Sequence, residues 1–339
     1  MIRILENISL KNFNTFGVEA KARYFAAISS YDTLRNLIRE RKPAKKKLLV
    51  MGDGSNLLFT GDFNGWILRN EIKGVEVVEE TDKHVLVKTG SGENWSDFVD
   101  LTVNNGWGGL ENLSLIPGTA GAAPVQNIGA YGVEQKDTFV SLEACNLMTG
   151  KICTFSRPEC DFGYRSSIFK VAEKGKWFVL NVTYRLKRKP ELNLGYAPLR
   201  KAFEGKPTGQ ITLKAVCDAV KSIRRSKLPD PQTLGNAGSF FKNPVVRQEK
   251  FNRLQQQFPE IPFYRLENGK VKIPAGWLIE QCGWKGKRVG NAGVHHRQAL
   301  VIVNFGGATG QEILQMAKAI QHNVRQQFDI GLEPEVLIL

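Results

Sequence analysis

The chain has 339 residues, of which 42% are hydrophobic and 24% charged, and its formal net charge at pH 7 is +14. This length and apolar content exclude general disorder and allow two or three domains with a substantial core. The N-terminus carries Arg3 and Glu6 but no long apolar run, and the apolar run Ala299–Val303 is too short to cross a bilayer. We therefore expect a cytoplasmic protein without a signal peptide or a membrane insertion.

The first third of the sequence predicts short strands alternating with helices. Tyr31–Arg41 has Leu34, Leu37 and Ile38 at helical spacing, so these side chains form one apolar face. Apolar runs on either side of this helix predict a β-α-β opening. A second helix is expected over Glu93–Asn105. The expected strands are Tyr24–Ile28, Leu48–Met51, Gly65–Asn70, Val75–Glu80 and His84–Thr89.

Beyond these elements the patterns predict a hairpin, a long strand and two helices. Met148-Thr-Gly150 has turn chemistry between two strand-like runs. The last helix begins with the capping box Thr309 to Glu312, and Gly331 is expected to end it. Lys187–Pro190 breaks the strand pattern, and we expect the main domain boundary there. The expected strands are Val140–Leu147, Lys151–Phe155, Trp177–Leu186 and Glu335–Leu339, and the expected helices are Thr212–Ser226 and the segment from Thr309 to Phe328.

A glycine-rich loop without lysine or arginine follows the strand expected at Leu48–Met51. Its sequence is Met51-Gly-Asp-Gly-Ser-Asn-Leu-Leu-Phe59. No Gly-Lys-Ser/Thr follows, so the loop is not a P-loop. Leu57 stands where the dinucleotide-binding fingerprint needs its third glycine, so the loop is not that motif either.

The segment Leu113–Gly132 has no charged side chain at all. Its four glycines and two prolines are typical of a tight turn, in which successive N–H groups can form a cup for an anion. The alternative is an internal crossover, where small residues let two chain segments touch. Together with the first glycine-rich loop, this segment favours a diphosphate held largely by backbone amides.

Two further segments hold candidates for chemistry. Asp161–Phe169 places Arg165 among hydroxyls and aromatic rings, where an arginine can clamp a carboxylate or a phosphate. An ordinary surface arginine beside a turn is the alternative. In Leu234–Pro244, Ser239 follows a glycine but lacks the Gly-x-Ser-x-Gly spacing of a hydrolase nucleophile. Its hydroxyl can donate a proton, or it can simply cap a backbone amide.

Metal and triad chemistry are not expected. His295 and His296 are adjacent, so on a strand they point to opposite faces. The five cysteines form no Cys-x-x-Cys pair, which favours reduced thiols over a disulfide framework. Glu333 and Glu335 alternate around a proline, so one can face a cleft while the other meets solvent.

The positive charge leaves two classes of partner open. The basic residues are spread over three stretches, and no tail concentrates them. A nucleic-acid-binding protein would place a basic face beside exposed aromatic rings. A protein that binds small acidic molecules would place a few cations at a cleft and the rest on its surface.

Taken in order, these segments closely resemble the UDP-N-acetylenolpyruvoylglucosamine reductase family, flavoproteins of bacterial peptidoglycan precursor synthesis. The resemblance implies an α+β chain with a two-lobed vanillyl-alcohol-oxidase-type FAD-binding fold and a separate α/β substrate-binding domain. The implied lobes are residues 1–70 and 71–190, followed by a substrate domain at 191–330 and a C-terminal strand at 331–339. Asn193–Leu199 resembles the tyrosine-bearing loop of the longer type in this family. The matching segments are Asn14–Gly17, Gly52–Asn56, Gly109–Gly118, Pro124–Gly132, Tyr164–Ser167, Asn236–Pro244, Ala275–Ile279 and Leu332–Val336.

The resemblance also implies the site residues. Arg165, Ser239 and Glu335 match the family's catalytic arginine, proton-donating serine and glutamate. The expected substrate contacts are Tyr164, Tyr196, Lys227, Asn243, Lys272 and Gln298. The expected FAD contacts are Gly52, Asp53, Gly54, Ser55, Asn56, Leu57, Ser114, Pro117, Gly118, Thr119, Gly121, Ala122, Asn127, Gly129, Ala130 and Tyr131.

The implied reaction uses NADPH and FAD to reduce UDP-N-acetylglucosamine enolpyruvate to UDP-N-acetylmuramate. Neither glycine-rich segment contains a His or Cys that could tether the flavin, so non-covalent FAD is expected. We expect a monomer that binds no nucleic acid and no metal. Two alternatives stay open: an FAD-dependent oxidase of the same fold, and a basic nucleic-acid-binding module without enzyme activity.

Overall fold

The computed structural model describes residues 2–41 and 43–339, and the chain forms two compact units. Unit 1 contains the residues up to Ile8 together with Ala22–Asp53 and Asn64–Ser226. Unit 2 contains Ser9–Lys21, Gly54–Phe63 and Lys227–Leu339. This division differs from the expected boundary near residue 190, because residues 191–226 pack with unit 1.

The first sheet of unit 1 has the strand order β1-β2-β5-β3. Its strands are β1 (Ile4–Ser9), β2 (Lys21–Ile28), β5 (Phe63–Asn70) and β3 (Leu48–Met51). Helix α1 (Tyr31–Arg41) buries Leu34, Leu37 and Ile38 in a core shared with Trp66, which confirms the expected apolar face. β1 was not expected, since polar residues interrupt its pattern and Asn7 has a φ of 52°.

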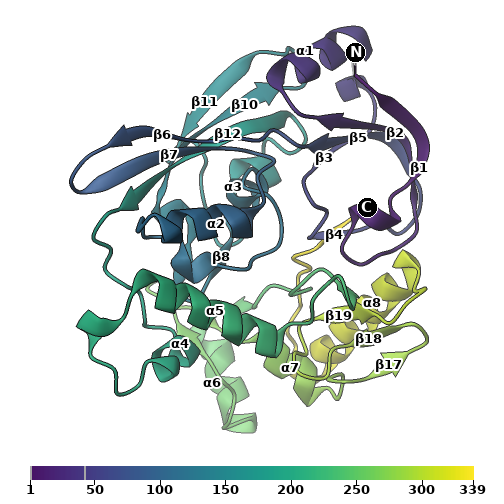
Figure 1. Ribbon diagram of the computed structural model, residues 1–339. Coiled ribbons are helices and arrows are strands. Elements are labelled where there is room, and N and C mark those ends of the chain that lie inside the picture. Colours follow the sequence, from purple (N-terminus) through teal and green to yellow (C-terminus); the bar gives the residue numbers. More distant parts are fainter. Residues whose placement is uncertain (1, 42) are drawn as a thin grey trace. The chain divides into compact units, whose positions relative to one another are not determined.

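A five-stranded sheet with the order β11-β10-β12-β7-β6 forms the rest of the unit 1 framework. All neighbouring strands in it are antiparallel. Figure 1 shows α2 (Trp95–Asn104) on one face of this sheet, where Phe98 lies 5.7 Å from the ring of Tyr184. The strands are β6 (Val75–Glu80), β7 (His84–Gly90), β10 (Phe139–Asn146), β11 (Ile152–Ser156) and β12 (Trp177–Lys187), which confirms the five expected here.

Shorter elements connect this sheet to a long helix. They are α3 (Ala122–Gln126), β8 (Gly129–Ala130), β9 (Val133–Glu134) and α4 (Ala197–Ala202). The long helix is α5 (Leu213–Lys227), and its Cys217 is buried in the core below the five-stranded sheet. This packing explains why residues 191–226 belong to unit 1.

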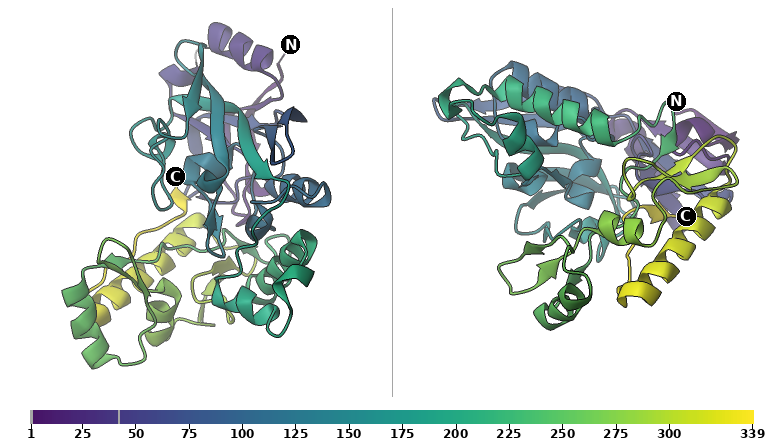
Figure 2. Two further views of the ribbon diagram at one scale, coloured as in Figure 1. Left: turned by 90° about the vertical axis from the view of Figure 1, so that its left-hand side faces the viewer. Right: turned by 90° about the horizontal axis from the view of Figure 1, so that it is seen from below.

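Unit 2 is built from short strands and three helices. β13-β19-β18-β17 and β14-β16-β15 form two sheets, and β20 pairs in parallel with β4. The strands are β4 (Leu57–Leu58), β13 (Gly235–Asn236), β14 (Val245–Val246), β15 (Tyr264–Arg265), β16 (Val271–Lys272), β17 (Arg288–Val289), β18 (Ala292–Val294), β19 (Ile302–Asn304) and β20 (Leu337–Ile338). The helices are α6 (Gln248–Gln257), α7 (Ala275–Gln281) and α8 (Gly310–Phe328). Figure 2 shows the yellow helix α8 beside the yellow-green strands β18 and β19.

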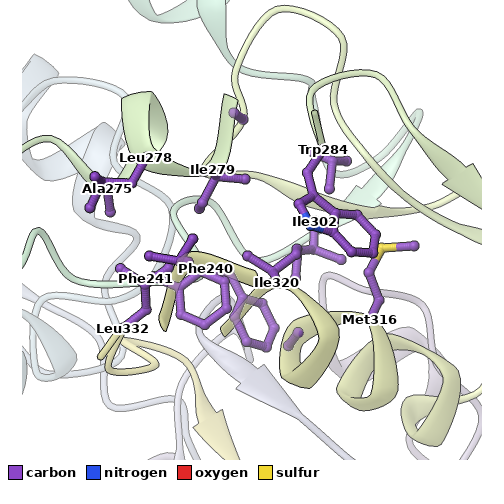
Figure 3. Packing of buried hydrophobic residues seen from close by; sticks show 14 of the residues in the cluster. Phe240, Phe241, Ala275, Leu278, Ile279, Trp284, Ile302, Met316, Ile320 and Leu332 are labelled. Carbon is purple, nitrogen blue, oxygen red and sulfur yellow. The ribbon is translucent and has the colours of Figure 1, made fainter. Parts of the chain in front are cut away.

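The core of unit 2 surrounds Phe240 and Phe241. Figure 3 shows these two rings among side chains of α7 and α8, including Ile279 and Ile320. The two rings directly follow the predicted catalytic serine, so burying them fixes the turn on which that serine lies.

The ends of unit 2 bring one confirmation and two corrections. The capping box at Thr309 and Glu312 is present, as expected. The prediction that Gly331 ends α8 was wrong, because Asp329 adopts the left-handed conformation there with a φ of 51°. The last strand is also shorter than the expected Glu335–Leu339, because only Leu337 and Ile338 pair with another strand, β4.

Among residues 2–41 and 43–339, no helix combines the length and the apolar character needed to cross a bilayer.

Candidate active site

In unit 1 the first glycine-rich loop and the central uncharged segment lie in direct contact. A Cβ added at Gly52 would lie 2.4 Å from the hydroxyl oxygen of Thr119. β3 ends just before Gly52, so a strand of the first sheet delivers this loop to Thr119. Any larger residue at position 52 would push the two segments apart.

The central segment is hydrogen-bonded to the residues at the start of α2. Trp95 donates its N–H to the Gly118 carbonyl at 2.9 Å, and Ala120 donates to the Glu93 carbonyl at 2.9 Å. A Cβ at Gly121 would lie 2.5 Å from the Cβ of Ser91. The small residues therefore serve a close approach of two segments, as one of the sequence alternatives proposed.

Several N–H groups at this contact are available to a ligand. Those of Gly52, Asp53, Gly118 and Thr119 donate to no acceptor among the residues that the structure describes. Donors of this kind at two abutting loops fit the phosphates of a dinucleotide such as FAD without needing a lysine. Burial raises the pKa of Asp53, with Arg69 and Lys73 opposing that shift.

Two of the predicted cofactor contacts have side chains turned to the interior. Ser114 is fully buried, and its hydroxyl donates to the Glu111 carbonyl at 2.6 Å. Asn127 is also fully buried, and its amide donates to Glu134 and to the Gly163 carbonyl. These side chains hold the loop in shape, so any contact with a cofactor would have to come from their backbone.

The remaining predicted contacts in this segment lie next to them. Pro117 directly precedes Gly118, Ala122 begins α3, and Gly129 and Ala130 form β8. Four non-glycine residues here have left-handed backbone, with φ of 58° at Leu115, 43° at Asn127, 50° at Tyr131 and 54° at Arg165. Such strain is often concentrated at functional sites.

Arg165 and three tyrosines gather at this strained region. Arg165 donates a hydrogen bond to the Gly129 carbonyl, and its guanidinium lies 5.8 Å from the centre of the Tyr164 ring. Tyr196 lies at the start of α4, and its ring meets that of Tyr131 edge-on at 5.2 Å. Arg165, Tyr131, Tyr164 and Tyr196 are thus all delivered by loops of unit 1.

Sequence reasoning missed Arg224, which lies against this group. Its Nε donates to the Leu115 carbonyl at 3.1 Å, and it also bonds the Tyr131 hydroxyl. Burial lowers the pKa of Arg224; the Tyr131 hydroxyl opposes this shift, and the Arg165 guanidinium adds to it. Across the described chain no carboxylate forms an ion pair with Arg224. An anionic group of a ligand would therefore be favoured beside it.

A signal for Arg224 was present in the sequence. It lies four residues after Val220 on α5, so it follows the buried stripe of that helix. The basic run around it suggested a solvated face instead. α5 is fixed by Lys221, whose ammonium contacts both carboxylate oxygens of Asp100 at 2.5 and 2.7 Å.

In unit 2 the second part of the glycine-rich loop meets the segment before β2. Gly54 has a φ of 67°, and a Cβ there would lie 2.1 Å from the Phe13 carbonyl oxygen. The N–H of Thr15 donates to the Gly54 carbonyl at 3.3 Å. Ser55 and Asn56 follow directly, and Leu57 enters β4 as a buried residue.

We expect Gly54→Ala to lose most bound FAD and to lower the unfolding temperature. The alanine would combine a left-handed backbone with a main-chain clash, at a cost of roughly 2 kcal/mol or more. Gly61→Ala is the matched control, because no atom lies within 4 Å of a Cβ there. Flavin content and thermal unfolding would be measured for both variants. Equal flavin content and equal unfolding temperatures would contradict this account.

The structure brings Ser239 and Glu335 into neighbouring segments of unit 2. The N–H of Glu335 donates to the carbonyl of Phe240 at 2.8 Å, and Asn56 donates to the Glu335 carbonyl at 3.1 Å. Glu333 behaves differently, because it is exposed and forms an ion pair with Lys242 at 2.5 Å. Glu333 therefore meets solvent, whereas the Glu335 side chain is half-buried.

Ser239 itself is exposed on a tight turn. Asn236 accepts the N–H of Gly238 at 2.9 Å, and Gly238 has a φ of 66°. The Ser239 hydroxyl makes no hydrogen bond to any part of the chain that the structure describes. It therefore does not cap a backbone amide, and it is available to a ligand.

Three predicted substrate contacts gather near the start of α7. The Asn243 side chain accepts the N–H of Ala275 at 2.9 Å. Gln298 reaches the same turn, since a Cβ at Gly276 would lie 3.1 Å from its side-chain oxygen. Lys272 lies three residues before Ala275, with its ammonium 5.5 Å from the centre of the Tyr264 ring. Lys227, the fourth residue, is exposed at the end of α5.

No group of three or more His, Cys, Asp or Glu residues is placed to hold a metal ion within residues 2–41 and 43–339. His295 is buried, and burial lowers its pKa. Its ring lies 4.5 Å from that of His296 at an interplanar angle of 51°, so the two side chains touch, and the expectation that they point to opposite faces was wrong.

Two family models match the chain. One is described as "UDP-N-acetylenolpyruvoylglucosamine reductase, C-terminal domain" and covers residues 230–339. The other is described as "FAD binding domain" and covers residues 22–156. The second match includes the glycine-rich loop and the central uncharged segment, and the first includes Ser239, Glu335 and the residues around α7.

Curated relatives match over the full length. A UDP-N-acetylenolpyruvoylglucosamine reductase of Flavobacterium johnsoniae is 49% identical over 339 residues, which is 100% of both chains. The reductase of Burkholderia multivorans is 49% identical and covers 100% of this chain and 97% of its own. That of Bacteroides fragilis is 48% identical and covers 98% of each chain.

Solved structures share the fold. The crystal structure of the reductase from Thermus caldophilus has a TM-score of 0.67 at 22% identity and covers 100% of this chain and 98% of its own. A solvent-stable cholesterol oxidase has a TM-score of 0.55 at 12% identity, covering 98% of this chain and 87% of its own. At these identities the likeness concerns the fold alone, an α+β architecture with an FAD-binding domain.

Proposed function

Because the chain belongs to the family of UDP-N-acetylenolpyruvoylglucosamine reductases, we propose NADPH as its reductant and a non-covalently held FAD as its cofactor. The chain is an FAD-binding oxidoreductase of peptidoglycan precursor synthesis. When bound, FAD supplies the redox chemistry by accepting a hydride from NADPH and passing one to the enolpyruvyl group. The observation that supports this proposal most is the pair of abutting loops with unused N–H groups at Gly52 and Thr119.

The loops would hold FAD chiefly through the backbone. The N–H groups of Gly52, Asp53, Gly118 and Thr119 would bind its phosphates, since uncharged amides suit a diphosphate in a partly buried place. Because Gly121 has no side chain, its backbone can lie against Ser91, which holds the segment Leu113–Gly132 in position. Neither loop carries a histidine or cysteine.

Arg165 would bind and polarise the substrate carboxylate. A hydride added to the terminal carbon of the enolpyruvyl double bond leaves an electron pair that spreads onto that carboxylate as an enolate. A guanidinium held beside it stabilises this charge most where it is greatest, in the transition state. Its bond to the Gly129 carbonyl fixes the side chain in advance.

Ser239 would donate the proton to the carbon next to the carboxylate. The new C–H bond takes the enolate's electron pair and completes the lactyl ether, so hydride and proton together add two hydrogens across the double bond. Glu335 would help to arrange this group, since its backbone is bonded to the residue after Ser239. Serine is a weak acid in water, but the enolate is a strong base.

The UDP part of the substrate would be recognised by neutral and cationic side chains. Lys272, Asn243 and Gln298 lie around the start of α7, where they would bind the diphosphate and its sugar. Lys227 would add a further cation. We assign the chain to the longer family type, in which Tyr196 on the 193–199 loop would contact the substrate, and we place the reaction in a cytoplasmic monomer.

The assay that tests this function follows NADPH absorbance. Oxidation should require UDP-N-acetylglucosamine enolpyruvate and should proceed without oxygen. An oxidase of this fold would instead need oxygen, and a nucleic-acid-binding module would be colourless and oxidise nothing.

Acid precipitation of the purified protein should release all its yellow colour to the supernatant. The reason is the missing histidine and cysteine in Met51–Phe59 and Leu113–Gly132. The absorbance of the supernatant and of the redissolved pellet would be compared with the flavin content before precipitation. Flavin that stays with the pellet would refute non-covalent binding.

Lys227→Ala should weaken substrate binding by roughly threefold to tenfold and leave flavin reduction by NADPH nearly unchanged. An exposed cation next to a phosphate contributes on the order of 1 kcal/mol. Arg225→Ala is the matched control, because Arg225 is an exposed cation on the same helix without a predicted contact. Stopped-flow of both half-reactions would be measured. Slow flavin reduction with unchanged substrate affinity would give Lys227 another role.

A further inference from the structure

A cavity of about 530 Å³ in unit 1 lies away from every residue assigned above. It is bounded by α1, by the short helical turn Pro43–Lys45 and by the loop between β10 and β11. Its apolar side consists of Ile38, Leu147 and Met148. This volume is large enough for a small organic ligand.

The walls of this cavity are ordered by the fold. Ile38 and Leu147 belong to the same buried cluster, so α1 and the end of β10 are packed together. The Tyr31 hydroxyl donates to the Gly150 carbonyl at 2.9 Å and ties the loop to the first residue of α1. Asn146 accepts the N–H groups of Met148 and Thr149, both at 3.0 Å, so the loop keeps its shape without a ligand.

The charge of the lining has one sign. Arg35, Arg39 and Lys45 line the cavity, and none of its described lining residues is acidic. In the described chain, neither Arg35 nor Lys45 forms an ion pair, while Arg39 has only an exposed contact with Glu40 at 3.8 Å. Three like charges around one cavity repel each other, and a multiply charged anion would relieve this repulsion.

We propose that this cavity binds a phosphorylated small molecule with an apolar or aromatic part, of the class of the nucleoside diphosphates. The three cations would take the phosphates, and the exposed Met148 side chain would cover the base above the buried Leu147 and Ile38. Met148 is 60% exposed, which is high for an apolar side chain and fits a surface that a ligand covers. This site is independent of the proposed function, because none of its residues has a role in the reaction.

The test uses calorimetry on the FAD-loaded full chain, with UDP-N-acetylmuramate in excess so that the substrate site is filled. ADP, inorganic tripolyphosphate and adenosine are titrated in turn. ADP should bind, tripolyphosphate should bind more weakly, and adenosine should not bind measurably. Affinity for ADP should fall as KCl is raised, since exposed charges are screened by salt.

The double variant Arg35→Ala/Arg39→Ala should weaken ADP binding about tenfold or more, because two cation–phosphate contacts are lost. Arg41→Ala, an exposed arginine of the same helix outside the cavity, should bind ADP like the unchanged chain. Flavin content and turnover should be unaffected in both, which shows that they fold. Absence of ADP binding, or equal binding by the double variant and the control, would overturn the proposal.

Discussion

Replacing Ser239 with alanine should lower the rate of substrate reduction by on the order of 10²–10⁴, while flavin reduction by NADPH stays nearly intact. Loss of a general acid has an effect of this size. It corresponds to roughly 3–5 kcal/mol of barrier. The Ser239 hydroxyl is exposed and forms no hydrogen bond within the described chain, so removing this hydroxyl should cost little stability.

Stopped-flow of the two half-reactions separates this role from a structural one. The Ser239→Ala flavin should be reduced quickly and then wait in the reduced state when the enolpyruvyl substrate is added. Ser239→Cys keeps an ionisable proton at the same place and should retain more activity than alanine. If NADPH oxidation collapsed while reoxidation by substrate stayed fast, Ser239 would not be the acid.

Replacing Arg165 with methionine should slow substrate reduction by roughly 10²–10³, the effect of removing one group that stabilises a developing oxyanion. Methionine has a similar length but no charge, so the carboxylate loses its partner in the transition state. The bond from Arg165 to the Gly129 carbonyl is lost as well. Flavin content therefore has to be measured beside both half-reactions.

Arg165→Lys is the matched comparison, because it keeps the charge and, like methionine, places a long non-glycine side chain on the left-handed backbone of position 165. Lysine cannot form the two parallel bonds that a guanidinium makes with a carboxylate, so it should restore only part of the rate. Full flavin content with slow reoxidation supports the electrostatic role. Unchanged reoxidation in Arg165→Met would contradict the electrostatic role. Loss of flavin without slower reoxidation would mean that Arg165 only holds its loop in place.

The sequence predicted long elements better than short ones. α1 and the five-stranded sheet have enough residues to show a period, whereas the strands described in unit 2 contain only two or three residues each. β1 was missed because Asn7 interrupts its pattern. Strands of two or three residues are too short to show a periodic pattern. They form only because they pair with segments that are distant in the sequence.

The division into units was also beyond sequence patterns. Both Ser9–Lys21 and Gly54–Phe63 lie in unit 2 although their neighbours in the chain lie in unit 1. The Phe13 carbonyl lies so close to position 54 that only glycine fits there, and no composition shift marks such a contact. No separate linker joins the units, because the chain crosses between them within β1, β2 and β5, in the glycine-rich loop after β3 and at the end of α5.

The candidate site was predicted in its residue types more than in its geometry. The resemblance supplied Ser239 and Glu335, and the structure adds that their segments are joined through Phe240. Arg224 was missed because it lies in a basic run, although its spacing from Val220 places it on the buried side of α5. Spacing therefore outweighs local charge when a long helix is interpreted.

The most direct test of the whole account is an anaerobic titration of the purified yellow protein. One equivalent of NADPH should bleach the flavin, and one equivalent of UDP-N-acetylglucosamine enolpyruvate should then restore the colour and yield one UDP-N-acetylmuramate. A flavin that stays bleached with this substrate and regains its colour only when oxygen is admitted would contradict the account.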